Sequence, residues 1–399
     1  MGYKWDTTPT LDRMAKDGLV FENAIAPGPR TPESMPAVFT GEFVPEKLPS
    51  EMVPQRQLIN RHMSARTTLP ERFSEAGYET TGFTPNPFAS RYFGFDGGFD
   101  YFQDFIGDGS DNLYQRLFRG WLGGDTASNV LRLSRNMLLR EEVFKPWEAF
   151  YEDVIDRAQQ ASKPYFLWIF LMDVHEPYIA GRGYHSLSWF KRWQAIWKLY
   201  LGDKGSPFDG RTRDRLLTTY DDSIRYTDAF FDRLLASLGE SDPVIAVHGD
   251  HGEAFGEHGV YSHEPYLYEE NVHVPLVFHG VEQDTIKQPM SLRSLPDLLT
   301  SITIDGQFDD VTNPFTEART AREDTIGLRT TDHKYIQHSG GDDLYTLCSN
   351  EREQVTGESA RELYRQVATN RRERIEEKRL LSAAAEETAA AESPTRRMQ

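Results

Sequence analysis

The sequence is short of cysteine, of long apolar runs and of basic charge, and each shortage excludes a class of protein. Its single cysteine, Cys348, excludes an intramolecular disulfide and a cysteine-rich zinc site. No run of about 18 apolar residues occurs, so the sequence predicts no transmembrane helix. Because 62 acidic residues outnumber 44 basic ones, giving a net charge of −18, nucleic acid is disfavoured as a partner.

The amino end also lacks a signal peptide, because residues 1–6 are polar and lead directly into a helix start. A sequence that begins in this way predicts a cytoplasmic protein. The chain does have the material for a large core, since 38% of its 399 residues are hydrophobic and 12% are aromatic. These proportions indicate a folded, enzyme-sized protein, and the excess of carboxylates is consistent with an acidic proteome adapted to high salt.

Strands and helices alternate along most of the chain, which predicts an α/β fold with a mostly parallel sheet flanked by helices. The apolar run Tyr165–Met172 is typical of a buried parallel strand, and residues 213–238 have the apolar stripe of a long helix. We expect the α/β domain over residues 1–320, a small antiparallel α+β subdomain over 321–357, and a charged helix over 358–399 that ends in a disordered low-complexity tail from residue 382.

The most informative stretch is an apolar strand, Val244–Val247, that runs into Asp250, His251, Gly252 and Glu253. Ligands gather beyond the carboxyl ends of strands in open α/β sheets. A carboxylate beside an imidazole at such a position can hold a divalent cation, and this pair admits Mn²⁺, Zn²⁺, Ca²⁺ or Mg²⁺. The alternative is a plain polar turn, since Asp, Gly and His are common turn residues. His258, further along the loop, is expected to be structural.

Six segments in this order resemble the sulfatase family of the alkaline phosphatase superfamily. They are residues 8–24, 31–41, 94–100, 172–178, 250–276 and 334–345. The resemblance spans roughly residues 7–350. It implies an alkaline-phosphatase-like fold and a metal-dependent hydrolase or transferase of sulfate or phosphate esters. The implied partner is a small anionic ester, including glycan-linked and lipid-linked ones, with no nucleic acid and no membrane span.

The same resemblance assigns the site residues. Counting back ten positions from Gly41 places Thr31 at the nucleophile, and Met35 stands where the formylglycine signature needs an arginine. Direct attack by threonine, as in the family's phosphoryl-transferring branches, is therefore expected, with phosphate esters favoured. The implied roles are: catalysis for Thr31, His175 and His263; substrate binding for Arg30 and Asn86; and metal binding for Asp250, His251 and Thr31. Simpler readings remain open for several of them: a helix N-cap for Thr31, a loop arginine for Arg30, a turn for Asn86 and a strand-end hydrogen bond for His175.

One family feature is not found in the sequence. The family begins with a buried strand that ends in paired aspartates, which supply half of the metal shell, and this strand would precede residue 1 here. Two explanations are open: the start is assigned too late, or the protein is truncated and inactive, binding anions or folding poorly. In either case we expect weak metal binding by residues 1–399 and an open apolar groove beside residues 165–172.

Overall fold

The computed structural model describes most of the chain. The described residues are 3–44, 47–105, 145–162, 164–202, 208–241, 243–306, 316–320, 325–347, 351, 354–355 and 357–392. Cys348 and most of the stretch 107–163, which the sequence predicts to be helical, lie outside them. No helix in these ranges is long and apolar enough to cross a membrane.

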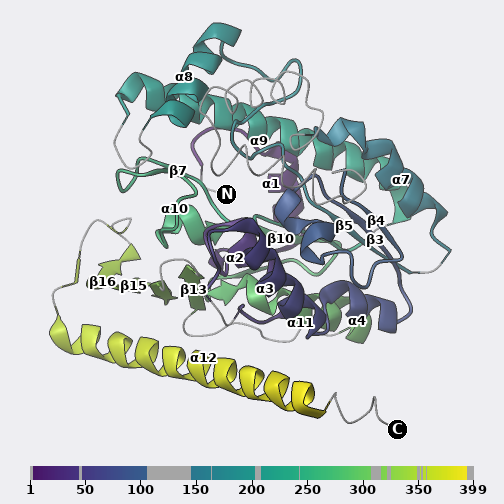
Figure 1. The fold of residues 1–399 in the computed structure, drawn as a ribbon. Helices are drawn as coiled ribbons and strands as arrows, with labels where there is room; N and C mark the ends of the chain where they lie inside the picture. The colour runs from purple at the N-terminus through teal and green to yellow at the C-terminus, as the bar shows by residue number, and fades with distance from the viewer. Residues whose placement is uncertain are drawn as a thin grey trace.

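The main body is layered, with helices on both sides of β-strands (Figure 1). The helices with their bounds are α1 (Pro9–Lys16), α2 (Thr31–Thr40), α3 (Met52–Ser64), α4 (Leu69–Glu75), α7 (Tyr151–Gln160), α8 (Trp189–Leu201), α9 (Gly210–Leu238), α10 (Glu269–Val272), α11 (Leu295–Thr300) and α12 (Glu358–Glu392). In Figure 1, α7, α8 and α9 lie on one side of the strands, and α2, α3, α4 and α11 lie on the other.

The strands form two larger sheets and smaller ribbons. Their bounds are β1 (Leu19–Phe21), β2 (Ala24–Ile25), β3 (Glu79–Phe83), β4 (Tyr101–Gln103), β5 (Tyr165–Ile169), β6 (Ile245–His248), β7 (Ala254–Phe255), β8 (Tyr261–Ser262), β9 (His273–Val274), β10 (Leu276–His279), β11 (Asp284–Ile286), β12 (Met290–Ser291), β13 (Thr316–Thr320), β14 (Thr325–Arg329), β15 (His333–His338) and β16 (Gly341–Thr346).

The main-body strands are ordered β4-β3-β5 in one sheet and β11-β1-β10-β6 in another. The first sheet is parallel, with Thr81 opposite both Tyr101 and Leu167. In the second, β1 pairs with β11 in parallel, and β10 runs antiparallel to both β1 and β6. Together with the flanking helices, these sheets confirm the expected α/β fold class with an antiparallel carboxyl-terminal addition.

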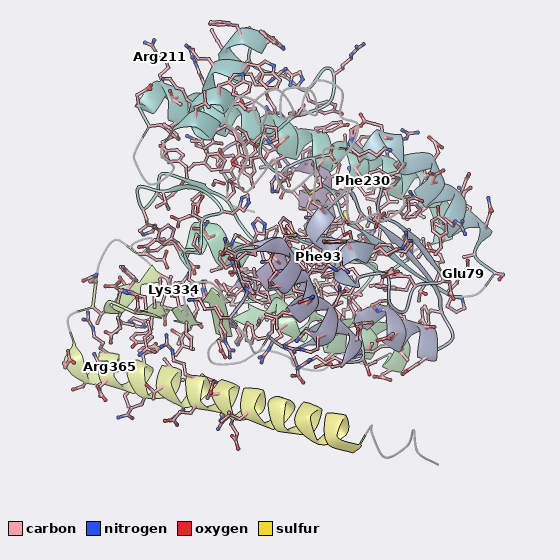
Figure 2. The ribbon with its side chains drawn as sticks, in the orientation of Figure 1. Glu79, Phe93, Arg211, Phe230, Lys334 and Arg365 are labelled. Atoms are coloured by element: carbon pink, nitrogen blue, oxygen red, sulfur yellow. The ribbon has the colours of Figure 1, made fainter. Side chains whose placement is uncertain are left out.

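The core lies on both faces of the strands because the side chains of β5 alternate. Trp168 and Phe170 pack into the cluster that contains Phe93, on the side of α2 and α3. Leu167 and Ile169 pack into the cluster that contains Phe230, on the side of α7 and α9. Phe93 and Phe230 are labelled in Figure 2, one in each helical layer. This alternation is the normal geometry of a strand covered on both faces.

The groove expected beside residues 165–172 is present. A cavity of about 1080 Å³ is lined by residues of β5, by residues of β6 and by the helices that cover them. Among the described strands, β5 and β6 are each the last strand of their sheet. The cavity therefore separates two sheet edges.

Residues 19–25 form two short strands, because Glu22 and Asn23 form a turn between β1 and β2. One local expectation needs correction. Part of the expected disordered tail, residues 382–392, belongs to α12, which ends at Glu392. Its alanine and glutamate residues have high intrinsic helix propensity, which explains why the helix continues through a low-complexity sequence.

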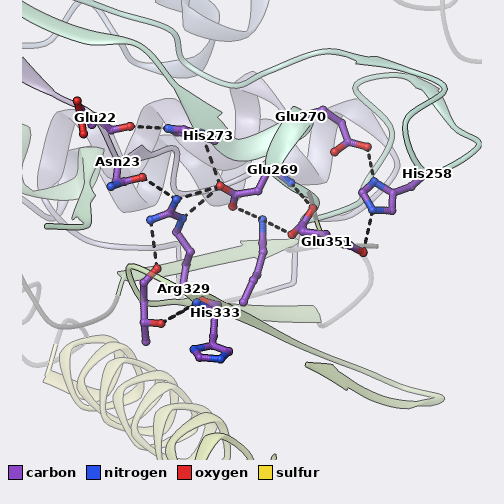
Figure 3. A network of polar contacts seen from close by, with 11 residues as sticks. Glu22, Asn23, His258, Glu269, Glu270, His273, Arg329, His333 and Glu351 are labelled. Atoms are coloured by element: carbon purple, nitrogen blue, oxygen red, sulfur yellow. Dashed lines mark hydrogen bonds and ion pairs between the residues drawn. The ribbon is translucent and has the colours of Figure 1, made fainter. Parts of the chain in front are cut away.

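The carboxyl-terminal strands form a four-stranded antiparallel sheet, β13-β14-β15-β16. It starts at Thr316, before the boundary that the sequence places at residue 321. The sheet is joined to the main body by Glu269, which binds Arg329 and Lys334 in a network shown in Figure 3. Both cations are nearly buried, with 6% and 2% of their side chains exposed. Burial raises the pKa of Glu269, but Lys334 and Arg329 outweigh it and bring the pKa down to about 2.

Replacing the Glu269 carboxylate is expected to destabilise the protein strongly. Glu269→Gln leaves the buried Arg329 without its counter-charge and leaves Lys334 with Glu351 alone, so the free energy of unfolding at pH 7 should fall by about 3 kcal/mol. Because the pKa of Glu269 is lowered in the folded state, the contribution of its carboxylate to the free energy of unfolding is complete above pH 4.5, the ordinary pKa. It is lost as the pH falls through about 2. Urea unfolding of both proteins from pH 7 to pH 2 measures the difference.

The control is Asp232→Asn, which removes an ion pair whose two side chains are 55% and 66% exposed. Exposed pairs contribute about 1 kcal/mol or less. If the two variants lost equal free energy of unfolding, or if the loss in Glu269→Gln did not change with pH, this role of Glu269 would be contradicted.

Candidate functional site

The loop after β6 brings a carboxylate and an imidazole to the carboxyl end of the strand. Asp250 and His251 follow β6 after Gly249, and both are largely buried. Gly252 lets the chain turn tightly here, since a Cβ at this position would lie 2.2 Å from the carbonyl oxygen of Glu270. The loop geometry thus requires glycine and directs both preceding side chains toward the amino end of α2.

Thr31 lies at the amino end of α2 and faces Asp250. Its hydroxyl donates a hydrogen bond to Asp250 Oδ2 with a donor–acceptor distance of 2.7 Å, although 219 residues separate the two. Thr31 is the first residue of α2, its N-cap is Arg30, and no side chain caps the helix. The N-cap interpretation of Thr31 is therefore wrong, and the hydroxyl is directed into the site. Gly41, in the left-handed conformation with φ 75°, ends the helix.

The donor atoms at this point fit a divalent cation. His251 Nδ1 lies 2.9 Å from the carbonyl oxygen of Gly252, which can only accept, so Nδ1 carries the proton and Nε2 carries the lone pair. That Nε2 lies 3.6 Å from Asp250 Oδ2. Two electron-pair donors that face each other at this distance suit a shared metal ion. A histidine that binds a metal through one ring nitrogen usually donates a hydrogen bond from the other, often to a backbone carbonyl, and this bond orients the ring. Thr31 Oγ1 offers a third donor.

His175 and His263 complete the opposite side of the site. The ring of His263 lies between the rings of His175 and His251, with centroid distances of 5.0 Å and 4.9 Å. His175 Nδ1 lies 2.6 Å from the carbonyl oxygen of Glu176, so the strand-end hydrogen bond also exists. Burial, helped by His263, lowers the pKa of His175 to about 4, so its ring is neutral near pH 7.

Behind the histidines lies Glu253, which sequence reasoning did not assign to the site. Its Oε2 accepts from His263 Nδ1 at 3.1 Å, and its Oε1 accepts from the Tyr178 hydroxyl at 2.9 Å. Burial, together with the charge of Glu253, raises the pKa of Tyr178 well above its ordinary value. Nearby, Ser262 donates to Glu176 Oε2 at 3.0 Å. These contacts join the loop after β5 to the loop after β6.

Backbone strain marks the same place. Tyr178 and Ser262 have φ values of 57° and 69°, which are unusual for residues other than glycine. Such conformations persist where surrounding contacts hold them, and they concentrate at functional sites. The adjacency of Glu253 to the Asp250 motif is the one sequence signal that could have identified it.

The two expected substrate-binding residues behave differently. Asn86 donates from Nδ2 toward Thr31 Oγ1 at 3.4 Å, and its Oδ1 accepts from the backbone of Phe88, so it lies in the site and also stabilises a turn. Arg30 is bound to Glu33 through Nη2 and Oε1 at 2.8 Å, in a pair whose side chains are 15% and 2% exposed. The structure therefore gives Arg30 a protein counter-charge, and it is not the exposed loop arginine of the simpler reading.

A separate group of metal-type side chains consists of His258, Glu270 and Glu351, whose ligand atoms lie within 4.8 Å of one another. Protein contacts already account for it. His258 Nδ1 lies 2.7 Å from Glu270, and Glu351 pairs with Lys334 at 3.3 Å (Figure 3). The ring of His258 also stacks on that of Tyr268, with a centroid distance of 3.9 Å. A buried ammonium group at this point disfavours a cation, and the structural role expected of His258 stays a prediction.

Comparison with known proteins gives a family and a set of related folds. The sulfatase family model matches residues 1–302. Among solved structures, a 2-O GAG sulfatase has TM-score 0.61 and 15% identity over 97% of this chain and 89% of that one. A phosphonate monoester hydrolase of Agrobacterium radiobacter has TM-score 0.62 and 14% identity over 96% and 92%. A protein of the alkaline phosphatase superfamily from Vibrio parahaemolyticus has TM-score 0.55 and 17% identity over 92% and 82%. No curated protein sequence matches the chain.

The donor set leads to a first prediction for the site. With only Asp250, His251 and Thr31 as donors, residues 1–399 should bind Mn²⁺ or Zn²⁺ weakly, with Kd on the order of 10⁻⁴–10⁻³ M, because tight sites use more ligands. Asp250→Asn should weaken this binding further, whereas His258→Gln should leave it unchanged. Isothermal calorimetry that finds tight stoichiometric binding, or binding lost in His258→Gln, would contradict the assignment.

Proposed function

The chain belongs to the sulfatase family, and from this premise we propose that it cleaves sulfate or phosphate esters with Thr31 as nucleophile, with phosphate esters favoured. The observation that carries the proposal is the 2.7 Å hydrogen bond from Thr31 Oγ1 to Asp250 Oδ2 beside the lone pair of His251. It aligns a hydroxyl, a carboxylate and an imidazole at the amino end of a helix, which is a favourable place for an anion.

The proposed reaction begins with attack by Thr31. As its oxygen forms a bond to phosphorus or sulfur, the hydroxyl proton passes to Asp250, which already accepts it, and the bond to the leaving oxygen breaks. A divalent cation held by Asp250, His251 and Thr31 would lower the pKa of the hydroxyl and neutralise charge on the transferred group. Asn86 and the backbone N–H of Thr31 would hold the remaining oxygens of the anion.

The two histidines receive different roles. His175 is neutral near pH 7, since its pKa is about 4, and its Nδ1 proton is held by the Glu176 carbonyl. Its Nε2 can therefore accept a proton, for example from the nucleophile that later releases the covalent intermediate. His263 has Glu253 at Nδ1, and this carboxylate supplies the counter-charge that an imidazolium needs. His263 is thus the better donor to the leaving oxygen.

The substrate class follows from the same chemistry. A formylglycine hydrate can expel sulfate by collapsing to an aldehyde, but a threonine ester must be displaced by a second nucleophile, which suits phosphoryl transfer. We therefore favour a small phosphate ester, including glycan-linked and lipid-linked ones, over a sulfate ester. A second candidate is an inactive anion-binding protein, which the small donor set of Asp250, His251 and Thr31 favours.

Replacing the nucleophile tests the first candidate. Thr31→Ala should abolish turnover of aryl phosphate and bis-aryl phosphate, while Thr31→Ser should retain part of it because the hydroxyl remains. Asp250→Asn should lower both rate and metal binding. Initial rates with aryl phosphate, bis-aryl phosphate and aryl sulfate decide the matter. Preferential hydrolysis of the sulfate that survives in Thr31→Ala would refute both the nucleophile and the substrate class.

Glu253 is expected to act on the reaction through His263. Glu253→Gln should lower kcat by about 10- to 100-fold with little change in KM, and it should move the part of the pH–rate profile that reports the proton donor. Glu282→Gln, at an exposed position, is the matched control. If only KM changed, or if the melting temperature fell while the pH profile stayed the same, Glu253 would only support the fold.

A further inference from the structure

The helix α8 exposes large apolar side chains at one margin of the molecule. Trp189, Phe190 and Leu201 are 61%, 68% and 64% exposed, and among the described residues only Leu363 on α12 is a further large apolar side chain above 60%. In Figure 1, α8 lies beyond α9 at the top of the view, opposite α12. Single exposed apolar side chains are ordinary, but three on one helix indicate an interaction surface.

The exposed side chains follow the helix as a stripe. Phe190, Trp197 and Leu201 are spaced by seven and four residues, which places them on one side of a helix with 3.6 residues per turn. Trp197 is half-buried, and its ring centroid lies 6.4 Å from that of Trp193, which lies 6.0 Å from that of Trp189. Three indole rings therefore succeed one another along α8. Indole is apolar with one polar N–H, so it favours the boundary between an apolar phase and water.

Cations accompany the apolar stripe, although the net charge of the chain is −18. The sequence of α8 contains no aspartate and no glutamate. Lys191 and Lys198, which are both exposed and seven residues apart, lie on the same side of the helix next to the stripe. Asp209 offsets part of this charge, because it binds Lys198 at 2.9 Å. That pair is about half exposed, so water weakens it.

The start of α9 extends the basic surface. Arg211 and Arg215 are four residues apart and so share one side of α9, and Arg215 donates a hydrogen bond to Gln194 on α8. Figure 2 labels Arg211 at the same end of the molecule as α8. Asp214 offsets one of these charges. The four cations of the two helices exceed the two carboxylates, Asp209 and Asp214, by two, against the strong negative charge of the whole chain.

An anionic lipid surface fits this combination better than a protein partner. Lysine is depleted at the centre of protein interfaces. Helices that lie on membranes combine Trp, Phe and Leu with Lys and Arg, whose apolar stems follow the apolar surface while the charged ends reach the headgroups. With 13 residues α8 is about 20 Å long, which is shorter than the roughly 30 Å of a bilayer core. The helix can therefore lie along such a surface.

The opposite face of α8 packs on the loop that carries His175. Leu199 belongs to one cluster with Tyr178, and Ile196 belongs to another with Ile179. A helix with its side chains is about 10 Å across. A lipid surface in contact with the outer stripe would thus lie about 10 Å from the residues that follow His175.

We propose that α8 docks the protein on an anionic phospholipid surface. Phe190, Trp197 and Leu201 enter the headgroup region, and Lys191 and Lys198 bind the lipid phosphates. The inference concerns this surface and does not depend on the proposed ester chemistry. A second copy of the chain on the same stripe is the alternative that the test must exclude.

Cosedimentation of the full chain with vesicles tests the proposal. The vesicles contain either phosphatidylglycerol and phosphatidylcholine in equal amounts or phosphatidylcholine alone. We expect binding to the anionic vesicles that weakens between about 0.1 M and about 1 M sodium chloride, because salt screens the headgroup charge. The double variant Phe190→Ser, Leu201→Ser should lower the partition coefficient about tenfold or more. Lys191→Gln should lower it about fivefold.

The matched controls are Leu363→Ser on α12 and Lys287→Gln, both at exposed positions, and they should bind like the unchanged chain. No binding to anionic vesicles, equal binding by all variants, or equal binding to both lipids at both salt concentrations would overturn the proposal. Light scattering that finds a dimer lost in the double variant, with no vesicle binding, would make the stripe a protein interface. If the double variant melts early, the comparison of Lys191→Gln with Lys287→Gln decides. These readouts do not involve catalysis, so a failed activity assay leaves them valid.

Discussion

The hydrogen bond between Thr31 and Asp250 is the constraint on which the rest of the site depends. It joins the start of α2 to the end of β6 across 219 residues of sequence. Both ends must be fixed for the bond to form. Gly252 fixes the loop after β6 by close approach to Glu270, and α2 is buried along its whole length. The site is therefore a product of the packing of two elements rather than of a local motif.

The second half of the site depends on a carboxylate that binds two loops together. Glu253, in the loop after β6, holds His263, which follows β8, and Tyr178, in the loop after β5. Since β5 and β6 belong to different sheets, these side-chain contacts and the covering helices join the two edges on either side of the cavity. The positive φ values of Tyr178 and Ser262 are held by the same contacts. The histidines are thus oriented by tertiary contacts beside the cavity between the two sheets.

The sequence was sufficient for features that depend on local pattern and motif order. The fold class, a buried strand within residues 165–172 and the family follow from the apolar pattern and from the six ordered segments, although β5 ends at Ile169. It was insufficient where contacts are long-range. Nothing local shows that Glu253 reaches Tyr178 or that Asp228 caps α1. The pairing of Arg30 with Glu33 has helical i, i+3 spacing and could have been anticipated. The low complexity of residues 382–392 suggests disorder, but their alanine and glutamate residues have high helix propensity and continue α12 to Glu392.

The central claim is that Asp250, His251 and Thr31 form one cation-binding and nucleophilic centre. Anomalous diffraction at the manganese edge, from crystals of the full chain grown with excess Mn²⁺, tests it most directly. The account predicts a peak between Asp250 Oδ2 and His251 Nε2, within reach of Thr31 Oγ1. A peak at His258, Glu270 and Glu351 with none at Asp250 would contradict it.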